Sequence, residues 1–97
     1  MSRKLLCTIA VGSVLLVAGS MVPARAAGPD FCHDYARMAV GQAREALSYR
    51  RCAFRIENES RWSTDYRFHY DWCRGVSREQ ADRERGARSH MLERCVH

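Results

Sequence analysis

Cysteine and histidine are the side chains of this 97-residue chain best suited to metal binding or nucleophilic chemistry. His69 and Cys73 stand four residues apart, a spacing that can hold zinc when both lie on one helix. Further pairs of neighbouring ligands occur at Cys32-His33 and Cys95-Val96-His97. These residues allow two interpretations: a metal-handling protein that uses His69 and His33, or a set of disulfides that occupies the cysteines.

The number of cysteines favours disulfides. Cys7 lies in an N-terminal segment that we expect to be removed, which leaves an even count of four: Cys32, Cys52, Cys73 and Cys95. Thiols of exported proteins are usually paired in disulfides. We therefore expect no bound metal and no cofactor, and metal handling remains an alternative.

Residues 1–26 have the pattern of a secretory signal peptide. Ser2-Arg3-Lys4 gives a positive start, Leu5–Ala18 an apolar stretch, and Ala24-Arg25-Ala26 a cleavage site. The apolar stretch is shorter than the about 20 residues that a membrane-spanning helix needs. We expect a single domain over residues 27–97, located in the periplasm or secreted, without stable membrane insertion after cleavage.

Removal of this segment changes the charge. Of 16 basic residues, 13 remain against 11 acidic ones, and all 13 are arginine. A nearly balanced charge argues against nucleic acid as a partner. It also disfavours a second alternative, a cationic membrane-active peptide or toxin.

Aromatic and basic side chains gather between residues 61 and 72. We predict Arg61, Trp62, His69 and Trp72 as contact residues for a ligand or partner, because aromatic faces beside cations suit a sugar ring or a peptide. The partner would be an unknown protein or a cell-envelope glycan. The competing interpretation is that these aromatic side chains fill a core that is poor in aliphatic residues.

Nucleophilic catalysis requires a serine or cysteine beside a base. His33, His69 and His90 are too scattered to suggest a triad, and no C-x-x-C motif occurs. We expect that the protein is not an enzyme.

The chain after residue 29 favours helices and shows no strand-like alternation. We expect helices over about residues 31–51, 63–73 and 77–95. The candidate N-caps are, in order, Asp30, Ser63 or Thr64, and Ser77, which forms a capping box with Gln80.

The expected buried faces are narrow and rich in small residues. The first helix has an apolar stripe at Cys32, Ala36, Ala39, Val40, Ala43 and Leu47. The third can offer a core only Ala81, Ala87, Met91, Leu92 and Cys95. Helices with so little apolar surface need covalent support.

Helix length restricts the disulfide pairing. A continuous first helix places Cys32 about 30 Å from Cys52, whereas a disulfide requires Cα atoms within about 7 Å. This excludes Cys32–Cys52 and with it Cys73–Cys95. An up-down-up order of the helices favours Cys32–Cys73 with Cys52–Cys95, and the third pairing requires the last helix to run the other way. We predict an all-α, disulfide-stapled three-helix domain.

The cysteine spacing with its neighbouring aromatic residues resembles that of small four-cysteine helical modules in exported proteins of proteobacteria. The resemblance rests on four stretches: Phe31-Cys32-x-x-Tyr35-Ala36, Arg61-Trp62-Ser63, His69-x-x-Trp72-Cys73 and Leu92-x-x-Cys95. It implies the cysteine framework and an exported location, and no particular activity. The sequence thus predicts a small non-catalytic binding or protein-interaction module.

Overall fold

The computed structural model describes residues 25–97, and the predicted signal peptide lies outside them except for its last two residues. The described part is all-α, as predicted, and contains no strand. Its helices are α2 (Pro29–Ser48), α3 (Arg50–Ala53), α4 (Tyr66–Arg74) and α5 (Arg78–Val96). None of these helices has the length and apolar character required to cross a membrane.

The first predicted helix is divided into α2 and α3. Its N-cap is Gly28, not Asp30, and Pro29 occupies the first turn, where a missing N–H costs no hydrogen bond. The helix breaks at Tyr49, whose backbone is extended. The Ser48 hydroxyl donates to the Glu45 carbonyl (2.7 Å), a local bond that competes with continued helix. The prediction of an unbroken helix to Arg51 was therefore wrong.

The segment between α3 and α4, residues 54–65, has no helix, and local side-chain bonds shape it. The Asn58 side chain accepts from the backbone N–H groups of Ser60 (3.1 Å) and Arg61 (3.3 Å). The N-cap of α4 is Asp65, whose carboxylate accepts from the Arg67 N–H, and not Ser63 or Thr64. Ser63 instead accepts from the Asp65 N–H (3.0 Å), so it organises the turn before the helix.

The start of α5 agrees with the prediction. Ser77 accepts from the Gln80 N–H (3.1 Å), and the Gln80 side chain accepts from the Ser77 N–H (3.1 Å). This capping box satisfies two backbone donors that would otherwise be left without a partner. Just before α5, the chain also holds the N-terminal segment: the Ala27 N–H donates to the Val76 carbonyl at 2.8 Å.

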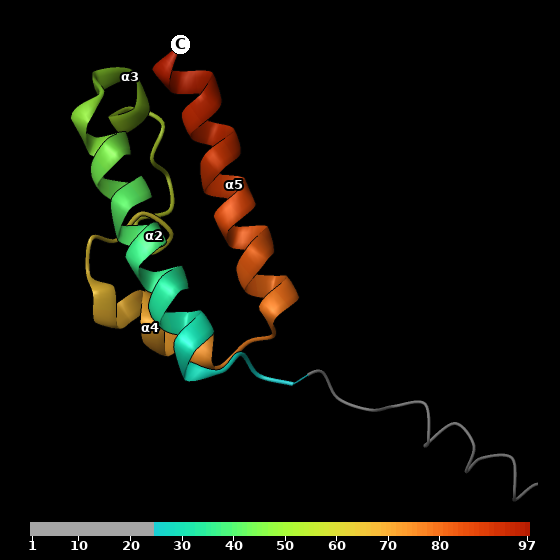
Figure 1. Cartoon of the computed structure of the whole chain (residues 1–97). Helices are drawn as coiled ribbons and strands as arrows, with labels where there is room; N and C mark the ends of the chain where they lie inside the picture. Colours follow the sequence, from blue (N-terminus) through green and yellow to red (C-terminus); the bar gives the residue numbers. More distant parts are fainter. Residues whose placement is uncertain (1–24) are drawn as a thin grey trace, which may run out of the picture.

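Figure 1 shows α2 and α5 side by side and running in the same direction, with α4 against the lower part of α2. Residues 54–65, which form no helix, carry the chain most of the way back from the end of α3 to the start of α4. This segment supplies the downward connection that the up-down-up order requires. Both predicted disulfides are present, Cys32–Cys73 and Cys52–Cys95, with Cα atoms 5.6 and 5.0 Å apart. One disulfide thus closes each end of the domain.

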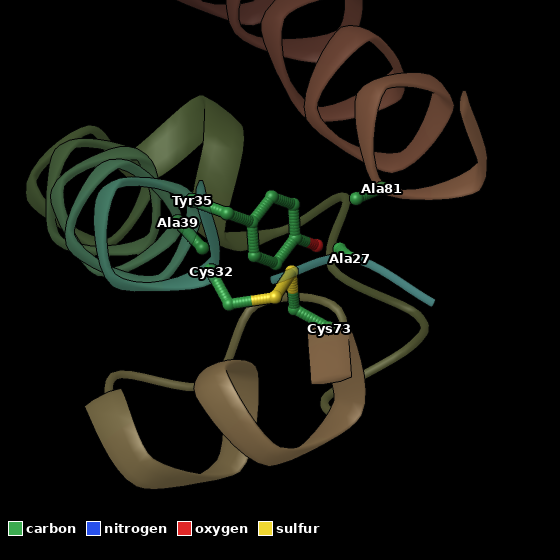
Figure 2. Packing of buried hydrophobic residues seen from close by; sticks show 6 residues of the cluster. All are labelled: Ala27, Cys32, Tyr35, Ala39, Cys73 and Ala81. Carbon is green, nitrogen blue, oxygen red and sulfur yellow. A yellow bond between two sulfur atoms is a disulfide. The ribbon is translucent and has the colours of Figure 1, made fainter. Parts of the chain in front are cut away.

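The core consists of two small clusters, each built around one disulfide. Figure 2 shows the first, where the Tyr35 ring lies beside the Cys32–Cys73 bridge with Ala27, Ala39 and Ala81. The second surrounds Cys52–Cys95 and includes Ala43, Ala46, Trp62 and Leu92. Leu47, predicted on the buried stripe, is 53% exposed, because Tyr35 and Ala46 occupy the face that turns inward.

We expect reduction of the disulfides to unfold the domain. The bonded cysteines are 41 and 43 residues apart in sequence, so each closed loop contributes about 4 kcal/mol in the chain-entropy model. Two such terms are comparable to the whole stability of a small domain, about 5–15 kcal/mol. Far-ultraviolet circular dichroism of the fully reduced protein should show loss of helix, and an unchanged spectrum would contradict this account.

Candidate functional site

The guanidinium of Arg88 lies between the two core clusters and is almost fully buried, with the residue 1% exposed. Its Nε donates to Gln42 Oε1 (2.7 Å), one Nη to the Tyr35 hydroxyl (2.9 Å), and the other to the Arg61 carbonyl (3.2 Å). It also lies 5.2 Å from the centre of the Tyr35 ring. A buried charge is tolerated only when it is well hydrogen-bonded, as this one is.

Sequence reasoning missed Arg88, although a signal was present. Ala81, Leu92 and Cys95 are buried on α5, and Arg88 falls on the same stripe, seven residues after Ala81 and four before Leu92. An arginine at such a position of a helix lies either at the edge of the buried face or inside it, where hydrogen-bond acceptors must surround its guanidinium. Gln42, on the facing side of α2, is the acceptor that would have indicated burial.

Gln42 is itself held in place from α5. Its amide nitrogen donates to the Ser89 hydroxyl (2.9 Å) and the Arg85 carbonyl (3.2 Å). These bonds direct the amide oxygen towards Arg88. The polar network therefore links α2 and α5 between the two apolar clusters.

A second arginine, Arg61, forms a bidentate ion pair with Glu84 on α5. Its Nε and Nη2 donate to the two carboxylate oxygens at 2.8 and 2.9 Å. These hydrogen bonds lower the pKa of the Glu84 carboxyl and raise the pKa of the Arg61 guanidinium. The pair attaches residues 54–65 to α5 and leaves Arg61 about a third exposed.

His69 on α4 is buried, with 2% of its surface exposed. Its Nε2 lies 2.7 Å from the Ser63 carbonyl, which can only accept, so Nε2 carries the proton. Burial lowers the pKa of His69, although this hydrogen bond partly raises it. The neutral ring contacts the rings of Phe68 and Tyr35 edge-on.

A pocket of about 160 Å³ opens between these groups. We call it the Arg88 pocket, and its wall comprises Tyr35, Arg61, Phe68, His69, Trp72 and Arg88. Asn58, Ser60 and Glu84 complete the wall. Its residues come from α2, α4, α5 and the segment 54–65, so only the folded chain brings them together.

Three of the four predicted contact residues meet in this pocket: Arg61, His69 and Trp72. The half-buried Trp72 ring lies 5.6 Å from the Tyr35 ring. The fourth, Trp62, is 7% exposed and packs in the core cluster around Cys52–Cys95. Trp62 therefore serves the fold and lies apart from the pocket.

The structure separates the residues considered as metal ligands. The sulfur of Cys73 is bonded to Cys32, and the His69 Nε2 to the Ser63 carbonyl. His33 contacts the Tyr66 hydroxyl at 2.7 Å. Within residues 25–97, no three His, Cys, Asp or Glu side chains lie close enough together to hold a metal ion.

We expect replacement of Arg88 to destabilise the domain strongly. Arg88→Ala leaves Gln42 and Tyr35 without their buried partner and opens a cavity, which costs about 2–4 kcal/mol. Arg85→Ala, one turn earlier on α5, removes an exposed pair with Asp82 and an exposed contact with the Met38 sulfur, and should cost under about 1 kcal/mol. Chemical denaturation of both variants measures this difference, and equal effects would contradict the role of Arg88.

We also expect mild acid to destabilise the protein through His69. Because burial lowers the pKa of His69 in the folded state, the unfolded chain takes up the proton first as the pH falls below about 6.5. The free energy of unfolding should therefore be highest above that pH and decrease below it, before Glu84 titrates at lower pH.

Urea denaturation between pH 5 and pH 8 tests this dependence. His69→Gln retains a donor for the Ser63 carbonyl and should flatten the profile in this range. His90→Gln, at an exposed position on α5, is the matched control and should leave the profile unchanged. A wild-type profile that stays flat between pH 5 and 7 would refute the assignment.

The chain matches no protein-family model, no curated protein and no solved structure. The resemblance to exported four-cysteine modules stays a prediction.

Proposed function

We propose that the protein is a small non-catalytic binding module of the periplasm or the extracellular space, and that the Arg88 pocket is its binding site. The observation that carries the proposal is the convergence of Arg61, His69 and Trp72 on one pocket above a buried arginine. Concave sites with aromatic walls and a few fixed polar groups are typical of ligand binding. The partner is a cell-envelope glycan or a protein.

The location is supported by two observations. Both disulfides are compatible with an oxidising compartment. The first 26 residues have the composition and cleavage site of a signal peptide.

The rigidity of the pocket also supports a binding role. The Cys32–Cys73 bridge holds α4, which carries His69 and Trp72, against α2. The Arg61–Glu84 pair and the bond from Arg88 to the Arg61 carbonyl hold the segment 54–65 against α5. A wall already fixed in the free protein loses little entropy when a ligand binds.

The chemistry of the wall supports binding without catalysis. The His69 Nε2 donates to a backbone carbonyl, which leaves Nδ1 as the only ring nitrogen able to accept a proton. The four cysteines of the described chain are all in disulfides.

Nuclear magnetic resonance mapping with a library of neutral, anionic and cationic ring compounds, including envelope sugar fragments, tests this function. We expect at least one class to shift resonances of Tyr35, Arg61 and Trp72. Trp72→Ala should weaken that binding about tenfold, the loss of one well-packed aromatic contact. Phe54→Ala, at a residue 84% exposed outside the pocket, is the control and should bind like the wild type.

If no compound shifts the pocket, or if Trp72→Ala binds as well as Phe54→Ala, the proposed site is wrong. Circular dichroism of both variants confirms that each remains folded.

A further inference from the structure

We infer that the Arg88 pocket binds a carboxylate carried on a single six-membered ring. This inference rests on the proposed binding function and adds to it the chemical class of the ligand. It follows from the charge of the pocket, from the donors of Arg88 and from the size of the cavity.

The pocket contains two guanidinium groups and one carboxylate. Glu84 uses both of its oxygens on Arg61, at 2.8 and 2.9 Å. Glu84 also forms a longer ion pair with Arg88, in which Oε1 and Nη1 are 3.9 Å apart, beyond hydrogen-bond distance. The hydrogen-bond acceptors of Arg88 within residues 25–97 are all uncharged, namely Gln42, the Tyr35 hydroxyl and the Arg61 carbonyl.

The two guanidinium groups therefore share one carboxylate, and these three groups together carry one net positive charge. His69 adds no positive charge to the pocket at neutral pH, because burial lowers its pKa. Keeping a cation away from water is unfavourable unless an anion lies nearby. A second anionic group in the pocket would balance the net charge.

The remaining donors of Arg88 indicate which anion fits. A guanidinium has five N–H groups, and hydrogen bonds within residues 25–97 use one on Nε and one on each Nη. One N–H therefore remains on each of two adjacent nitrogens. Free N–H groups on both Nη atoms of a guanidinium can bind the two oxygens of a carboxylate.

The volume of the Arg88 pocket and the side chains in its wall indicate which group carries the carboxylate. A cavity of about 150 Å³ accommodates benzene in a well-studied protein, and the Arg88 pocket has about 160 Å³. The rings of Phe68 and Trp72 in its wall can stack on the face of an aromatic ring or a sugar. The pocket thus suits one ring with its acidic group directed towards Arg88.

Such a ring acid can be a free aromatic carboxylate or a uronic acid of an envelope glycan. Two pairs of probes, each an acid with its neutral counterpart, distinguish these sources. Calorimetric titration of the oxidised protein compares benzoate with benzamide and glucuronate with glucose. We expect the acid of at least one pair to bind about tenfold more tightly than its neutral counterpart, the difference made by one charge-assisted hydrogen bond.

A variant then tests the charge itself. Arg61→Gln removes one of the two cations at a partly exposed position and should weaken binding of the preferred acid about tenfold. The same substitution should weaken binding of the neutral counterpart less than binding of the acid, because the neutral probe makes no charge-assisted hydrogen bond. Arg85→Gln replaces a partly exposed arginine of α5 outside the pocket and should change neither affinity.

Each outcome bears on one of the two proposals. If neutral and acidic probes bind the pocket equally, or if Arg61→Gln weakens both alike, the carboxylate inference is wrong and the binding function stands. If only cationic or neutral ring compounds shift the resonances of the pocket, the carboxylate inference is also wrong and the binding function still stands. If no ring compound binds there, both the inference and the proposed function fail.

Discussion

The two disulfides are the constraint on which the rest of the structure depends. Helix α2 offers the core mainly alanines, and α5 offers only Ala81, Leu92 and Cys95 as fully buried apolar residues. Small side chains bury little apolar area, so helix packing by itself contributes little free energy. Cys32–Cys73 and Cys52–Cys95 compensate by closing both ends of the domain, and α2 and α5 must then run in the same direction.

Between the two ends the helices meet through polar groups. The layer formed by Gln42, Arg88 and the Tyr35 hydroxyl fills the middle of the interface, where an ordinary small domain has apolar side chains. A buried network of this kind specifies one arrangement, because any shift of α5 along α2 would leave a charged group without acceptors. The disulfides thus hold the helices together, and Arg88 determines their register.

The candidate binding site is a consequence of this arrangement. Arg88 anchors the segment 54–65 through the Arg61 carbonyl, and Glu84 anchors it through the Arg61 side chain. The cavity that remains beneath α4 is lined by the same groups that stabilise the fold. A domain of this size therefore has a preformed pocket without a separate layer of structure to support it.

The sequence by itself determined the helical class and the capping box of α5, and the spacing of the cysteines excluded a Cys32–Cys52 bridge. The choice between the two remaining pairings depended on the order of the helices in space. Only the tertiary structure decided that Trp62 joins the core, that Leu47 is exposed and that the first helix breaks at Tyr49. The burial of Arg88 also belongs to this second group. Its partners Gln42 and Tyr35 lie 46 and 53 residues away in sequence. Local sequence patterns cannot show which of several polar side chains becomes buried, because burial depends on which distant helix packs against that side chain in the folded protein.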